Sequence, residues 1–426
     1  MKLAAKETNK LSKLMNAFAN SNNEMGNVII DYERSEYYNL RDSLYELPEI
    51  KKVYDEDILM NQIVHYINRT YKKYPIHILP EHIDEILSKA IEILQREIND
   101  HLIILPIKIL KLNDVVSFDI FTFIPSHFSK RRKQNIIAKL IKKSRPDLAE
   151  TFEHTEISRS KLFFRYNLLS IKIKEHTNYT HFNSTNIVKT VLYSLRCYYY
   201  SMVWKINSPE LNFNSIQIEK MPKPSHIAIY SKDIWRQIHK PIFFDGDCNF
   251  DATWLTDIKH QKKFTKFVNV IYFKKDSNDL QNRFLNALWL FNDAINQSKS
   301  ISTLLFMTVA ESLLVRERNE KRLRIAAVLP MLVKIENVSS RKLAEVLDST
   351  YHARNNFIHS GEYIIYTYKE IKEKLDTLQL TRAALATLIF QLPKYIVALS
   401  SQKAGSPSVN DWDNYVNNLF KKKVMG

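Results

Sequence analysis

From about residue 277 to residue 400, apolar residues recur with the period of an α-helix. The first stripe consists of Leu280, Phe284, Leu288, Phe291 and Ile295. Spacings of three and four residues place such side chains on one helical face, which must be covered by another element. Similar stripes predict further helices at about 302–316, 320–334, 341–357 and 367–392. Helices joined by connections this short favour a bundle.

The chain before this bundle has a different character. Residues 1–100 predict a helical N-terminal segment, whose first 30 residues are polar enough to suggest a loosely held arm. Short runs rich in branched and aromatic residues predict strands at 102–110, 115–124, 162–173, 225–230 and 264–273. The expected fold class is therefore mixed: a helical segment at 1–100, a basic α+β domain at 101–276, an all-α bundle at 277–400 and a polar basic tail at 401–426.

Composition excludes several classes of protein. With 5 glycines in 426 residues, the chain has neither of the common glycine-rich phosphate loops. Cys197 and Cys248 lack nearby cysteine partners, and the histidines show no metal-binding spacing, so we expect no metal site and no cofactor. No long apolar run indicates a signal or a membrane span, and we expect a cytoplasmic protein without a membrane partner.

The net charge of +16 is concentrated in the middle of the chain. Residues 101–276 hold 29 Lys and Arg against 15 Asp and Glu, a net charge of +14. Such a field attracts polyanions, RNA above all, although it also serves solubility. The segment 130–145 predicts a basic amphipathic helix that either guides RNA or simply docks on the sheet as a solvated surface helix. The predicted RNA contacts are Lys130, Arg131, Arg132, Lys133, Lys139, Lys142 and Lys143 from this segment, with Arg322 and Arg324 from the bundle. For the two bundle arginines, ordinary surface pairing with the interleaved Glu317 and Glu320 is an equal alternative.

The stretch STYHARNNFIHSGE at 349–362 places an arginine on a buried helical stripe. Arg354 continues the stripe from Thr350, four residues earlier. Gly361 is the residue type preferred as a left-handed helix cap. We therefore expect the helix to end at His359, which frees the imidazole to turn toward the face of Arg354.

Arg354-Asn355-Asn356-Phe357-Ile358-His359 resembles the R-x4-H motif of HEPN domains (higher eukaryotes and prokaryotes nucleotide-binding). The upstream Ala310-Glu311-Ser312-Leu313 is similar to an element of the abortive-infection branch of that superfamily. The resemblance covers residues 277–400. It implies a metal-independent antiviral endoribonuclease, with a composite active site in a homodimer, that leaves a 2′,3′-cyclic phosphate and a 5′-hydroxyl. It further implies Arg354, Asn355 and His359 as catalytic residues and a viral trigger or a neighbouring regulator.

Other interpretations remain open at this stage. Glu311 is expected to tether Arg354 or Asn355 rather than to react. Alternatively, Arg354 simply pairs with a buried carboxylate such as Glu311 while His359 caps the helix. The bundle would then be a non-catalytic module for dimerisation or nucleic-acid binding with a regulatory role.

Overall fold

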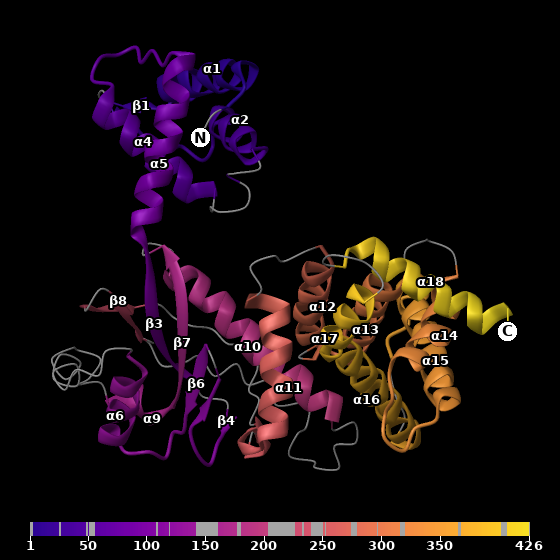
Figure 1. Cartoon of the computed structure of the whole chain (residues 1–426). Helices are drawn as coiled ribbons and strands as arrows, with labels where there is room; N and C mark the ends of the chain where they lie inside the picture. Colours follow the sequence, from indigo (N-terminus) through magenta and orange to yellow (C-terminus); the bar gives the residue numbers. More distant parts are fainter. Residues whose placement is uncertain are drawn as a thin grey trace. The chain divides into compact units, whose positions relative to one another are not determined.

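The chain folds into two compact units, which are described separately (Figure 1). The first comprises residues 1–101, 173–180 and 231–233, and the second comprises 102–172, 181–230 and 234–426. The computed structural model describes residues 3–24, 27–47, 50, 56–107, 110–118, 120–141, 161–176, 180–202, 226–231, 234–239, 250–251, 253–273, 279–295, 297–315, 320–364, 368–401 and 407–425.

The first unit is mainly helical. Its elements are α1 (Ala5–Ser21), the short hairpin β1 (Asn23–Glu24) and β2 (Asn27–Val28), α2 (Ser35–Tyr45), α4 (Glu56–Thr70), the 3-10 turn η1 (Pro80–His82) and α5 (Ile83–Glu97). The prediction of a loose arm over the first 30 residues is wrong. Leu11, Met15 and Phe18 of α1 are buried, at spacings of four and three residues, and lie in the core shared with α2, α4 and α5.

A six-stranded sheet occupies the middle of the chain in the order β5-β6-β7-β3-β8-β9. Its strands are β3 (Ile98–Ile107), β5 (Val116–Ser117), β6 (Phe121–Ile124), β7 (Asn167–His176), β8 (His226–Ser231) and β9 (Ile234–His239). Strands β6 and β7 pair in the antiparallel direction, and their register places Phe121 opposite Ile171. A separate two-stranded parallel ladder joins β4 (Leu110–Lys111) to β10 (Phe250–Asp251).

In its described part, the chain forms four helices between and after these strands and ahead of the bundle. They are α6 (Lys130–Leu140), α9 (Lys161–Arg165), α10 (Thr180–Met202) and α11 (Ile258–Val268), with the 3-10 turn η3 (Thr253–Thr256) before α11 and the π-helical turn η4 (Asn269–Phe273) after it. The strand predicted at 264–273 is therefore wrong. Its buried residues Phe264, Phe267, Val268 and Ile271 follow helical spacing, and the dense aromatic and branched composition concealed that period.

The predicted helices of the bundle are present in the described part of the chain. They are α12 (Asp279–Ile295), α13 (Lys299–Leu314), α14 (Lys321–Leu332), α15 (Ser340–Ser360), α16 (Tyr368–Phe390) and α17 (Leu392–Ser400). Helix α15 packs against α13, α14 and α16, and it carries the candidate motif. No single described helix has the length and apolar content of a membrane span; the bent pair Thr377–Phe390 and Leu392–Ser400, at 44° to one another, meets those two criteria only when taken together.

The segment expected as a polar tail forms one more packed helix, α18 (Val409–Met425), beside α12 and α14. Trp412 is fully buried, and its indole nitrogen donates a 2.7 Å hydrogen bond to the carbonyl of Leu313. Its ring meets that of Phe284 edge to face at 5.3 Å. Helix α18 thus packs as part of the bundle through its buried face.

Candidate functional site

Glu311 of α13 is the centre of a polar cluster that joins three helices. Its Oε1 accepts a 2.8 Å hydrogen bond from the hydroxyl of Tyr351 and lies 3.4 Å from an Arg354 guanidinium nitrogen. Its Oε2 accepts a 2.9 Å hydrogen bond from Lys321 Nζ of α14. Asn355 holds the same guanidinium from the other side, since its Oδ1 accepts a 2.9 Å hydrogen bond from Arg354.

The cluster keeps an unbalanced positive charge. Lys321 and Arg354 each contribute +1 and Glu311 contributes −1, so the group carries a net charge of +1. The side chains of Arg354 and Glu311 are only 18% and 16% exposed, which strengthens their electrostatic interactions relative to those in water. Within the described chain, Arg354 Nε is buried without a hydrogen-bond partner. The net charge suits an additional anion next to the exposed part of Arg354, whereas the buried Nε is closed to solvent.

Tyr351 is locked in its neutral, donating form. Burial raises the pKa of Tyr351 to about 12, and the neighbouring Glu311 carboxylate acts in the same direction. The guanidinium of Arg354 lies 5.4 Å from the centre of the Tyr351 ring, a cation–π distance. Tyr351 is thus a positioning group for Glu311 and Arg354.

His359 lies on a different face of α15 from Arg354, contrary to the expected turn of the chain. The helix continues to Ser360, and Gly361 caps it in the left-handed conformation with φ of 66°. The glycine cap was therefore predicted correctly, but the histidine remains helical. Five helical residues rotate a side chain by about 140° and advance it by about 7.5 Å. In the described part of the chain no hydrogen bond joins the exposed His359 to Arg354.

A second histidine shares the exposed face of His359. His352 precedes it by seven residues, and Asp348, Asn355 and His359 complete a stripe at intervals of four, three and four. The sequence interpretation missed His352, although this spacing could have identified it. Ile358, four residues after Arg354, is 43% exposed beside the polar cluster.

The basic helix α6 keeps only part of the predicted RNA surface. Lys130, Arg131, Arg132 and Lys139 are exposed. Lys133 must be removed from the set, because it is fully buried and its ammonium donates to the carbonyls of Phe164 and Tyr166 at 2.6 and 2.8 Å. Burial lowers the pKa of Lys133 to about 8. The remaining two predicted contacts, Lys142 and Lys143, fall outside the described residues.

The two arginines predicted to contact RNA from the bundle have separate environments. Arg322 is half exposed and forms a two-point ion pair with Asp348, at 2.5 and 2.6 Å. This pairing holds the pKa of Asp348 below its usual value. Arg324 is instead buried against α18, where it bonds Asn417 and stacks 4.7 Å from the centre of the Phe420 ring. Because its guanidinium is enclosed, Arg324 is also removed from the predicted RNA contacts.

Among the described residues, no three His, Cys, Asp or Glu side chains come together as a metal-binding group. The geometry therefore offers an arginine-centred cluster, Glu311, Lys321, Tyr351, Arg354 and Asn355, and an exposed histidine stripe on the same helix. Comparison with family models, curated proteins and solved structures found no match for this chain.

Proposed function

We propose that the protein is a metal-independent endoribonuclease of the HEPN type, active as a homodimer. The observation that carries the proposal is the net positive cluster around Arg354 on the same helix as the exposed His359. Cleavage by attack of the neighbouring ribose hydroxyl needs proton transfer, which a histidine supplies, and stabilisation of the phosphoryl charge, which an arginine supplies.

The reaction assigns each residue one task. His359 exchanges protons with the ribose 2′-hydroxyl or with the leaving 5′-oxygen, as an imidazole does near neutral pH. The 2′-oxygen attacks phosphorus, the bond from phosphorus to the 5′-oxygen breaks, and the leaving oxygen receives a proton. Arg354 stabilises the charge on the phosphoryl oxygens. The products are a 2′,3′-cyclic phosphate and a 5′-hydroxyl.

A second copy of the chain explains why Arg354 and His359 lie on different faces of α15 within one protomer. One imidazole cannot serve as base and acid in the same step, and a twofold axis near α15 supplies a second one. The same axis brings the histidine stripe of one copy toward the arginine cluster of the other. Covering Ile358, which is 43% exposed, adds an apolar contribution to that contact.

The test is an RNA cleavage assay in EDTA with total cellular RNA and tRNA. Wild-type protein should leave cyclic phosphate ends, whereas His359→Ala and Arg354→Ala should lose at least about 100-fold in rate. His65→Ala is the matched control, since His65 is an exposed helical histidine in the other unit. Equal cleavage by the wild type and His359→Ala, or no cleavage under any condition, refutes the proposed activity.

The pairing of Arg354 with Glu311 at 3.4 Å favours one alternative function. In that alternative the bundle is a non-catalytic module that dimerises or binds nucleic acid, and the ion pair is purely structural. Analytical ultracentrifugation and RNA binding separate the two. A module of this kind dimerises or retains RNA without producing cyclic phosphate ends, whereas the nuclease produces them. Antiviral abortive infection, with a viral trigger in the cytoplasm, remains the setting proposed from the motif.

A further inference from the structure

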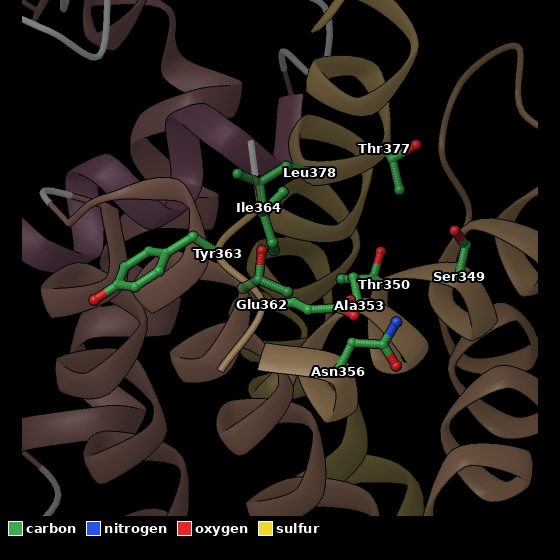
Figure 2. Close-up of a pocket in the computed structure, with 10 residues that line it drawn as sticks. Ser349, Thr350, Ala353, Asn356, Glu362, Tyr363, Ile364, Thr377 and Leu378 are labelled. Carbon is green, nitrogen blue, oxygen red and sulfur yellow. The ribbon is translucent and has the colours of Figure 1, made fainter. Parts of the chain in front are cut away.

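A polar cavity of about 260 Å³ lies on the side of α15 away from the Glu311 cluster. It is enclosed by α13, α15, α16 and the segment after Gly361 (Figure 2). Its polar lining comes from Thr303, Ser349, Thr350, Asn356, Glu362 and Thr377. The volume falls just below the range of about 300–1,000 Å³ typical of small-molecule sites, so the cavity fits one ring system rather than a whole nucleotide.

Three of the lining side chains, Ser349, Asn356 and Glu362, make no hydrogen bond within the described part of the chain. Asn356 is half-buried, whereas Ser349 and Glu362 are exposed at the rim of the cavity. Thr350 is already satisfied, because its hydroxyl bonds the Val346 carbonyl at 2.8 Å and the Thr381 hydroxyl at 3.1 Å. Figure 2 shows Asn356 and Glu362 beside Thr350, while the ring of Tyr363 points away. The groups left for a ligand are thus a hydroxyl, an amide and a carboxylate.

Asn356, which lines the cavity, lies close to the face of α15 that carries His359. Asn356 precedes His359 by three residues, which is about 60° of rotation and about 4.5 Å along the helix. His352 lies four residues before Asn356 on the adjoining surface. A nucleotide whose phosphate lies at His359 therefore has this cavity within reach of its base.

The amide of Asn356 and the carboxylate of Glu362 match the edge of guanine. A carboxylate only accepts hydrogen bonds, and guanine presents an imino N–H and an amino group side by side as donors. The Asn356 amide can donate to the guanine O6 acceptor. Uracil has no amino group, and the negative charge of Glu362 disfavours a phosphate in the same place.

We propose that this cavity is a guanine-binding subsite that selects the base next to the cleaved phosphate. Its role in cleavage rests on the proposed nuclease function, whereas its affinity for the base does not. The subsite makes the second asparagine of the Arg354-Asn355-Asn356 run a reader of the base, distinct from the Asn355 that holds Arg354.

The test is calorimetric titration of the full chain with 5′-GMP, AMP, CMP, UMP and inorganic phosphate. We expect GMP to bind at least tenfold more tightly than the other four. Glu362→Gln and Asn356→Ala should each weaken GMP binding at least tenfold and leave the circular dichroism spectrum unchanged. Glu345→Gln, an exposed substitution on the same helix outside the cavity, should bind GMP as the wild type does. Equal binding of all nucleotides, no binding of GMP, or full affinity in Glu362→Gln refutes the subsite.

The result can be separated from the fate of the nuclease proposal. Selective GMP binding by a chain that never cleaves RNA upholds the subsite and removes the activity. Cleavage of RNA without preference for guanine, together with the absence of GMP binding, upholds the activity and removes the subsite. If the chain both cleaves RNA and has the guanine subsite, GMP inhibits cleavage competitively. Glu362→Gln then loses both the inhibition by GMP and the preference for guanine.

Discussion

The hydroxyl of Tyr351 donates a 2.8 Å hydrogen bond to Glu311 Oε1 and thereby ties α15 to α13. The same carboxylate oxygen lies 3.4 Å from Arg354, so the hydrogen bond of the tyrosine and the ion pair of the arginine meet at one oxygen. Glu311 carries the only negative charge in the cluster, and its position determines where the guanidinium lies. The first prediction follows from that arrangement.

Glu311→Gln should destabilise the protein and alter the ionisation of Tyr351. The free energy of unfolding is expected to fall by about 1–2 kcal/mol, since Lys321 and Arg354 lose their neutralising partner. The pKa of Tyr351, raised to about 12 by burial first and by Glu311 second, should move partway back toward its usual value. Denaturant unfolding measures the first effect, and NMR of labelled tyrosine measures the second. Glu345→Gln, which affects an exposed ion pair, should cost less than about 0.5 kcal/mol; an equal cost in both variants contradicts a central role for Glu311.

Gly361→Ala should destabilise the end of α15 through backbone strain alone. Gly361 has φ of 66°, and an added Cβ would meet no heavy atom within 4 Å. The expected loss in unfolding free energy is about 1–2 kcal/mol, the cost of the left-handed conformation for an ordinary residue. Gly361→Asn is the matched control and should lose clearly less, because asparagine tolerates this conformation. Equal losses for the two variants would show that strain at φ is not the cause.

The helix cap and the arginine stripe were predictable because both depend on local spacing. The sequence places Gly361 directly after the helical period ends, and only a glycine adopts positive φ without cost. The face of His359 also follows from the period, since five residues give about 140° of rotation. The error was to end the helix one residue early and let the side chain turn.

The environments of Lys133 and Arg324 were less accessible to sequence reasoning. Lys133 precedes the buried Ile137 by four residues, so its place on the apolar face of α6 could have been found, but the carbonyls that bind it come from 164 and 166. Arg324 is enclosed by Asn417 and Phe420 of α18, about a quarter of the chain away. A count of basic residues records the charge of a segment but not which cations are buried.

Lys133→Met should remove a pH dependence of stability. Burial lowers the pKa of Lys133 to about 8, against about 10.4 for an ordinary lysine. Between those two values the unfolded chain binds more protons than the folded chain, so the wild type gains stability as pH rises through this range. The difference in unfolding free energy, wild type minus Lys133→Met, should therefore increase by about 2–3 kcal/mol from pH 7 to pH 10. A difference that stays constant with pH would show that Lys133 titrates normally in the folded protein.

Replacing three of the four exposed cations of α6 should weaken RNA binding without affecting the fold. Lys130, Arg131 and Lys139 are exposed, so Ala substitutions at all three should change the unfolding free energy by less than about 0.5 kcal/mol each. Each lost phosphate contact reduces the dependence of log K on log salt by about 0.7 for single-stranded RNA, or about 2 for three. Fluorescence anisotropy with a labelled single-stranded RNA at several salt concentrations measures this slope.

The matched control for α6 is the triple alanine variant of Lys6, Lys10 and Lys13, exposed residues of helix α1 in the other unit. Residues 1–100 contain 13 Lys and Arg against 17 Asp and Glu, so this surface lacks the basic field of the middle of the chain. Its three substitutions remove the same charge as those on α6 but should leave the salt slope unchanged. Equal flattening of the slope by both variants would mean that only the total charge of the protein matters, and α6 would then have no specific part in guiding RNA.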